Sequence, residues 1–190
     1  MNCAVRNVAN FDSRKLVRWI AVVSAIALTA LSLAGAARAQ EGGTATAAPQ
    51  PSGRGADNDA ISALIDQYVQ SVETADTNLA AQIWSDSPDD SFIFPAGQAL
   101  GFDEIKRVVY VGAMAGNFSQ RQLNLHNVKV HVYGDTAWSE FDWDFEAKLR
   151  KDGSSITTYG METQIYRKQS TGWRLVHVHY SVVTPATQAP

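Results

Sequence analysis

Hydrophobic residues recur along this chain with two different periods, that of a helix first and that of a strand afterwards. One set is spaced three and four residues apart and falls on a single helical face: Ile61, Leu64, Ile65, Tyr68, Val69 and Val72. Shorter patterns predict a second helix over 78–85, with Thr77 as its N-cap, and a third helix with Asp103 as its N-cap. The folded part of the chain therefore opens with helices.

The later part of the chain alternates between apolar and polar residues. A short strand is predicted over 91–94, and alternation continues over 123–132. Over 137–150, Phe141, Trp143 and Phe145 alternate with acidic residues, which is the period of a strand. An Asp-Gly turn at 152–153 leads into strands over 156–167 and 173–183. Helices followed by an antiparallel meander predict an α+β fold, with the helices packed on one face of the sheet.

The first 56 residues have a different character. A basic start at 14–18 is followed by 19 uncharged residues, 19–37, and by Ala37-Arg38-Ala39, a small-x-small cleavage site. This pattern predicts a signal peptide over 1–39, and hence a periplasmic or secreted protein; an uncleaved membrane anchor is the alternative, because 19 residues just span a bilayer. Residues 40–56 are rich in Gly, Ala, Thr, Pro and Ser and are predicted to be a flexible spacer. The domain is predicted over 57–184 and a disordered tail over 185–190.

Charge and cysteine content exclude several function classes. Loss of residues 1–39 would remove five of the 16 basic and one of the 19 acidic residues, which changes the net charge from −3 to −7. Such an acidic chain has no electrostatic footprint for nucleic acid, and no membrane association is expected after cleavage. The single cysteine, Cys3, lies in the removed segment, so neither a disulfide nor a thiol nucleophile is expected. Without a glycine-rich phosphate loop, a nicotinamide fingerprint or a CxxC pair, no cofactor is expected.

Three segments carry a family resemblance. They are Tyr68-Val69-Gln70-Ser71-Val72-Glu73-Thr74-Ala75-Asp76, Val130-His131-Val132-Tyr133-Gly134-Asp135-Thr136-Ala137 and Gly172-Trp173-Arg174-Leu175-Val176-His177-Val178-His179-Tyr180-Ser181. Over 57–184 the chain resembles the SnoaL-like branch of the nuclear-transport-factor-2-like superfamily. Glu162-Thr163 with Tyr166 is also similar to the association domain of calcium/calmodulin-dependent protein kinase II, of the same superfamily.

The resemblance implies that a curved antiparallel sheet wraps around the N-terminal helices. The wrapped sheet forms a cone with a pocket at its open end. Members often dimerise through the outer face of the sheet, so a homodimer is expected. They include isomerases, cyclases, hydratases, binding proteins and oligomerisation hubs. The fold alone therefore does not settle the function.

The resemblance also suggests site residues. Tyr68 occupies the place where ketosteroid isomerases, another branch, keep an oxyanion-hole tyrosine, which donates a hydrogen bond as charge develops on a carbonyl. Their catalytic base, an Asp before Pro, corresponds to Phe94 here, so the same proton shuttle is not expected. Their second oxyanion acid falls near Glu162 or Thr163. A core tyrosine with a satisfied hydroxyl is the alternative for Tyr68.

Two further groups have two interpretations each. His177 and His179 point to one face of a strand, a spacing that suits zinc binding, but the sequence marks no third ligand. The favoured interpretation is that they lie in a subunit interface or form hydrogen bonds within the sheet. No metal is therefore expected. The acidic residues Glu140, Asp142, Asp144 and Glu146 lie outside the cone if the aromatic residues between them fill the core, and inside it if the register shifts by one residue.

Three functions follow from these observations. The first is binding of a small, largely apolar molecule in the cone, with Tyr68, Trp84, Phe94, Glu162 and Tyr180 as the pocket residues. The second is an isomerase, cyclase or dehydratase that uses Tyr68 with Glu162 or Asp142. The third is an oligomeric scaffold with a vestigial pocket.

Overall fold

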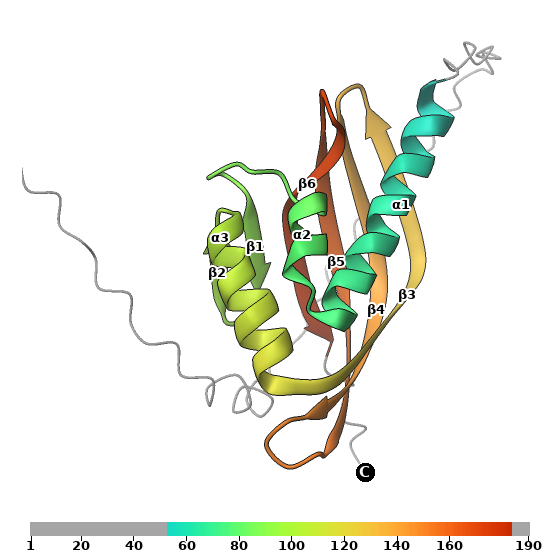
Figure 1. The fold of residues 1–190 in the computed structure, drawn as a ribbon. Helices are drawn as coiled ribbons and strands as arrows, with labels where there is room; N and C mark the ends of the chain where they lie inside the picture. The colour runs from blue at the N-terminus through green and yellow to red at the C-terminus, as the bar shows by residue number, and fades with distance from the viewer. Residues whose placement is uncertain (1–52, 184–190) are drawn as a thin grey trace, which may run out of the picture. The chain divides into compact units, whose positions relative to one another are not determined.

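The computed structural model describes residues 53–183 (Figure 1). The predicted signal peptide, residues 40–52 of the predicted spacer and the predicted tail lie outside these residues. Between residues 53 and 183, no helix has both the length and the apolar character needed to cross a membrane.

In the described part of the chain, four helical segments precede the long strands. They are α1 (Gly53–Thr74), α2 (Thr77–Ile83), the short α3 (Phe102–Ile105) and the π-helix η3 (Lys106–Ala115), which directly continues α3. α1 begins at Gly53, before the predicted domain start at Asp57. Asp57 therefore lies inside the helix, where its carboxylate accepts hydrogen bonds from Lys168 Nζ at 2.6 Å and Trp173 Nε1 at 2.9 Å.

The start of α2 differs from the prediction by one residue. Asp76, not Thr77, is the N-cap, because its Oδ1 accepts hydrogen bonds from the main-chain nitrogens of Asn78 at 2.8 Å and Leu79 at 3.1 Å. A carboxylate at this position satisfies main-chain N–H groups that have no partner inside the helix.

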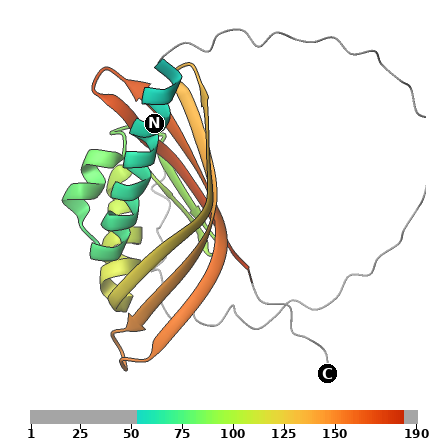
Figure 2. The same ribbon diagram turned by 90° about the vertical axis from the view of Figure 1, so that its right-hand side faces the viewer.

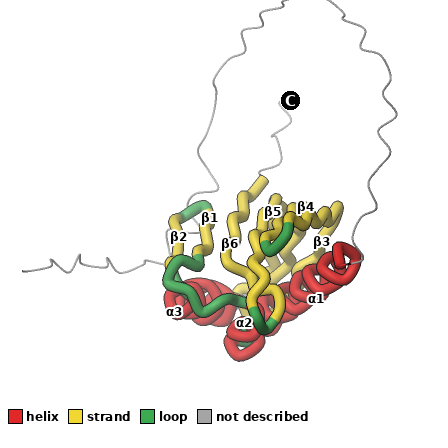
Figure 3. Tube along the Cα trace, turned by 90° about the horizontal axis from the view of Figure 1, so that it is seen from above, coloured by secondary structure: helices red, strands yellow, loops and turns green. Residues whose placement is uncertain are grey.

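Within residues 53–183, six strands form one sheet: β1 (Ser91–Phe94), β2 (Gly97–Leu100), β3 (Phe118–Tyr133), β4 (Thr136–Leu149), β5 (Ser155–Gln169) and β6 (Gly172–Val183). Their order is β2-β1-β6-β5-β4-β3; β1 runs parallel to β6 and all other neighbours are antiparallel. The helices cover one face of the sheet (Figure 1), and the sheet curves around them (Figures 2 and 3). The predicted α+β architecture is confirmed. We call the face under the helices the inner face and the opposite one the outer face.

The register of β4 decides between the two placements of the acidic residues. Phe141, Trp143 and Phe145 are buried on the inner face, so the acidic residues between them lie on the outer face. There Asn127 Nδ2 donates to Asp142 Oδ2 at 2.7 Å, and Asp144 Oδ1 lies 2.6 Å from the Nε2 atom of His126. These acidic side chains therefore form a partly solvated surface, and several of them bind side chains of β3.

Candidate functional site

Tyr68 and Glu162 meet in the interior between α1 and the sheet. Tyr68 lies on the buried face of α1, and Glu162 lies on the inner face of β5. The Tyr68 hydroxyl donates a hydrogen bond to Glu162 Oε2 at 3.3 Å. Their exposed fractions are only 2% and 6%. The structure thus brings together a carboxyl group and a phenol that are 94 residues apart in the sequence.

A chain of polar side chains fixes the other oxygen of Glu162. Gln164 Nε2 donates to Glu162 Oε1 at 2.7 Å, and the Tyr166 hydroxyl donates to Gln164 Oε1. Since Tyr166 is already the donor there, Ser139 Oγ, 3.1 Å from the Tyr166 hydroxyl, acts as the donor to it. Both oxygens of Glu162 are held by neutral donors, and no cation accompanies this buried carboxyl group in the ion pairs of residues 53–183.

Burial without a cation changes the acidity of both partners. Desolvation raises the pKa of Glu162 to about 7, although the hydrogen bonds from Gln164 and Tyr68 favour the ionised form. Desolvation, together with the neighbouring carboxyl group of Glu162, also raises the pKa of Tyr68 well above its usual value. At neutral pH, Glu162 is therefore able both to accept and to release a proton, and Tyr68 stays a protonated hydrogen-bond donor.

A second chain of hydrogen bonds anchors Tyr68. Ser71 Oγ donates to the main-chain oxygen of Tyr68 at 2.7 Å and accepts from the Tyr110 hydroxyl at 3.2 Å. Trp84 Nε1 in turn donates to the Tyr110 hydroxyl at 3.2 Å. The segment of α1 that carries Tyr68 is thereby tied to η3 and to the end of α2.

A cluster of aromatic side chains adjoins the pair through Tyr180, which lies opposite Glu162 in the register of β5 and β6. Phe92 lies next to Trp84, Phe94 and Tyr180, at ring-centroid distances of 6.2, 6.3 and 5.9 Å. Trp143 meets Tyr180 edge-on at 5.8 Å. Phe94 and Tyr180 are only half-buried, so they form the side of this aromatic cluster that approaches solvent.

Of the five residues predicted to bind a ligand, Tyr68, Trp84 and Glu162 are buried, and Phe94 and Tyr180 are half-buried. Of the predicted catalytic candidates, Tyr68 and Glu162 come together, whereas Asp142 is separated from them by the sheet. The alternation along β4 turns its carboxylate to the outer face, so Asp142 cannot serve as the partner of Tyr68. Thr163, the neighbour of Glu162, is exposed.

His177 and His179 lie on the outer face. His177 Nδ1 is 2.7 Å from Ser91 Oγ on the neighbouring strand, and His179 is exposed. Within residues 53–183, no group of three or more His, Cys, Asp or Glu side chains is arranged to hold a metal ion.

Sequence reasoning missed several members of the two hydrogen-bond chains. Gln164 and Tyr166 follow Glu162 at intervals of two, so the strand period places all three on one face and could have revealed them. Ser71 and Tyr110 gave no comparable signal. Tyr110 is fully buried within a π-helix, whose wider turns change which side chains face inward.

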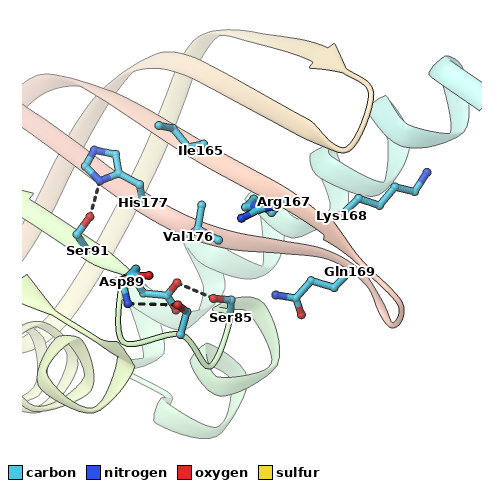
Figure 4. Close-up of a pocket in the computed structure, with 11 residues that line it drawn as sticks. Ser85, Asp89, Ser91, Ile165, Arg167, Lys168, Gln169, Val176 and His177 are labelled. Atoms are coloured by element: carbon cyan, nitrogen blue, oxygen red, sulfur yellow. Dashed lines mark hydrogen bonds between the residues drawn. The ribbon is translucent and has the colours of Figure 1, made fainter.

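A pocket of about 600 Å³ lies apart from this site (Figure 4). Its lining includes His177 and Arg167 and none of the five predicted ligand-binding residues.

Comparison with known proteins gives a family match over most of the domain. Residues 61–185 match the SnoaL-like domain model. A solved nuclear transport factor 2-like (NTF2-like) superfamily protein from Salmonella enterica serovar Typhimurium is 38% identical; the alignment covers 72% of this chain and 99% of that chain, with a TM-score of 0.67. The chain matches no functionally curated protein.

Two more distant structures share the fold. The hexachlorocyclohexane dehydrochlorinase LinA-type3 from Novosphingobium barchaimii is 17% identical, with 72% of this chain and 97% of that chain covered and a TM-score of 0.59. An NTF2-like protein from Streptomyces avermitilis, named for a proposed dehydratase activity, is 22% identical, with 69% and 99% covered and a TM-score of 0.61.

Proposed function

We propose that this chain, which belongs to the SnoaL-like domain family, binds a small, largely apolar molecule in its interior and moves a proton on it. Isomerisation, cyclisation and dehydration are the reactions of this class. The observation that carries the proposal is the buried Tyr68–Glu162 pair, in which desolvation raises the pKa of Glu162 to about 7. A carboxyl group that titrates near neutral pH is suited to general acid–base work.

Each partner has a distinct role in this proposal. A carbonyl oxygen of the substrate replaces Glu162 as the acceptor of the Tyr68 hydrogen bond, which frees Oε2 to take a proton from the adjacent carbon. Tyr68 then stabilises the negative charge that develops on the oxygen. Glu162, now a carboxylic acid, returns the proton to another carbon in an isomerisation or to a departing hydroxyl in a dehydration. Gln164 keeps the carboxyl group oriented throughout.

The surroundings favour an apolar substrate with few oxygen atoms. Aromatic side chains lie beside the pair, and we place the entrance for a substrate next to Phe94 and Tyr180, because they are the half-buried members of the cluster. Trp143 Nε1 is buried without an acceptor in the described part of the chain, so one donor remains for a substrate oxygen. A buried donor without a partner costs about 1–3 kcal/mol, which an accepting ligand would recover.

Solvent exchange tests the proposal on defined probes. In D₂O, the wild-type protein should speed exchange of the α-protons of 2-cyclohexenone or 1-indanone, followed by proton NMR. Glu162→Gln should reduce the rate to background, and Tyr68→Phe should reduce it by about 100-fold or more. Glu146→Gln, an exposed carboxylate on the outer face, is the matched control. Equal rates for wild type and Glu162→Gln would refute the catalytic role.

Native mass spectrometry separates catalysis from binding alone. A small molecule that leaves the protein on denaturation, and that Trp84→Ala or Tyr180→Ala no longer retains, would support binding in the interior. An empty protein that also exchanges none of the probes would contradict both functions and favour the scaffold.

We also propose that two copies pair through the outer face. Tyr159, Met161 and Val183 are 47%, 55% and 51% exposed, and the register sets Tyr159 beside Val183. Light scattering should give a dimer for the wild type and a monomer for Met161→Glu. A monomeric wild type at micromolar concentration would remove both the dimer and the scaffold.

Export is the last part of the proposal, and it rests on residues 14–39 of the sequence. N-terminal sequencing of the protein recovered from the periplasm or the medium should begin at Gln40. An intact N-terminus in a membrane fraction would favour the anchor instead.

A further inference from the structure

The pocket outside the interior is a second candidate site (Figure 4). On one side it is lined by the segment 85–91, which connects α2 with β1 and enters that strand. On the other side it is lined by the end of β5 and the start of β6. Its volume, about 600 Å³, lies in the range of small-molecule sites.

One wall of this pocket is acidic. Asp89 is exposed, whereas the adjacent Asp90 is only 1% exposed. Ser85 Oγ donates to Asp90 Oδ1 at 2.5 Å, while Oδ2 of Asp90 has no hydrogen-bond partner among residues 53–183. Burial raises the pKa of Asp90 to about 6, so the group is mostly ionised at neutral pH. A buried carboxylate without a cation strongly favours a positively charged neighbour.

Among the described residues, the opposite wall offers one positive charge without an ion-pair partner. Arg167 is exposed, projects from β5 at the pocket (Figure 4), and forms no ion pair with the described residues. Lys168 is engaged elsewhere, because its Nζ lies 2.6 Å from Asp57 Oδ1. Burial and the neighbouring His179 lower the pKa of His177, so its ring is neutral at neutral pH and adds no charge.

Between the charged walls the lining is partly apolar. Ile165 on β5 and Val176 on β6 are half-buried and both line the pocket. An occupant therefore meets the exposed carboxylate of Asp89, the buried charge of Asp90 nearby, one guanidinium and a short aliphatic surface.

We propose that this pocket binds an α-amino acid with an aliphatic side chain. The ammonium group meets Asp89 directly and lies above the buried charge of Asp90. The carboxylate pairs with the planar guanidinium of Arg167, which suits two-point recognition of carboxylates. The side chain lies on Ile165 and Val176. This site is separate from the Tyr68–Glu162 pair and stands or falls independently of the function proposed above.

Calorimetric titration of the full chain with three matched probes tests the proposal. L-Leucine carries both charges, isoamylamine lacks only the carboxylate, and 4-methylpentanoate lacks only the ammonium group. L-Leucine should bind with a dissociation constant below about 1 mM, and each of the other two at least about ten-fold more weakly.

Variants locate the site. Asp90→Asn and Arg167→Gln should each weaken L-leucine binding at least about ten-fold, whereas Asp103→Asn, Arg107→Gln and Glu162→Gln should leave it unchanged. Arg167 is exposed, so its variant tests the site even if Asp90→Asn does not fold. Absence of L-leucine binding, equal binding of isoamylamine, or binding unaffected by Arg167→Gln would overturn the proposal.

Discussion

Glu162→Gln should change how the stability of the fold depends on pH. Burial raises the pKa of Glu162 from 4.5 to about 7, so the folded state holds a proton that the unfolded chain releases more easily. This contribution is fully present below about pH 4.5 and is lost as the pH rises through about 7. The gap between the two pKa values corresponds to about 3 kcal/mol of unfolding free energy.

Glutamine removes this cost and fits the same place. Its carbonyl oxygen can accept from Gln164 Nε2, and its amide can donate to the Tyr68 hydroxyl oxygen. The variant should therefore match the wild type at about pH 5 and exceed its stability by about 2–3 kcal/mol at about pH 8.

Urea denaturation at both pH values measures this difference. Glu146→Gln on the outer face is the control, and it should show no such pH-dependent gain. If the difference between Glu162→Gln and wild type were the same at both pH values, Glu162 would titrate as a solvated carboxyl group and the reasoning would be refuted.

Three further substitutions test the packing that supports the site. In Gly160→Ala, the new Cβ would lie 1.9 Å from the Ser181 carbonyl oxygen and 2.3 Å from the Trp143 ring. We therefore expect the unfolding free energy to fall by about 1–3 kcal/mol and the tryptophan fluorescence to change. Unchanged stability and fluorescence would contradict this close approach. Asp76→Ala should cost about 1 kcal/mol in chemical denaturation because α2 loses its cap, whereas an unchanged midpoint would mean that the cap is dispensable. Arg121→Gln should lower the unfolding free energy by at least about 3 kcal/mol, because the Arg121 guanidinium donates to main-chain oxygens of α1, η3 and β3 at 2.8–2.9 Å. A loss under about 1 kcal/mol would show that water replaces these hydrogen bonds.

Periodicity predicted most of the fold. The apolar face of α1 and the alternation along β4 each commit a long segment to one orientation, because a slip of one residue in a strand would expose Phe141, Trp143 and Phe145. β2 was not predicted. It has four residues and only Ala99 is buried, so its pattern is too short and it forms by pairing with β1.

The starts of the helices were predicted less well, because they depend on contacts that the local sequence does not reveal. α1 extends back to Gly53, while Asp57 within it bonds to Lys168 and Trp173, more than 100 residues away. Thr77 was predicted as the cap of α2 from its residue type alone, although Asp is favoured at N-caps as well as Thr. The observed hydrogen bonds show that Asp76 fills this role.

The site was predicted only in part. The resemblance suggested Tyr68 and Glu162, and the structure joins them directly. Asp142 was equally available to the sequence argument until the register of β4 placed it on the outer face. The raised pKa of Glu162 results from its desolvation by burial, a property of the assembled interior that no local pattern contains.

The most direct test of the central claim is a carbon-13 NMR titration of the Glu162 side-chain carboxyl group, assigned by its disappearance in Glu162→Gln. The proposed proton-transfer site predicts a titration midpoint near 7. A midpoint near the ordinary value of 4.5 would show that Glu162 is an exposed acid rather than a buried proton carrier, and would contradict the proposal.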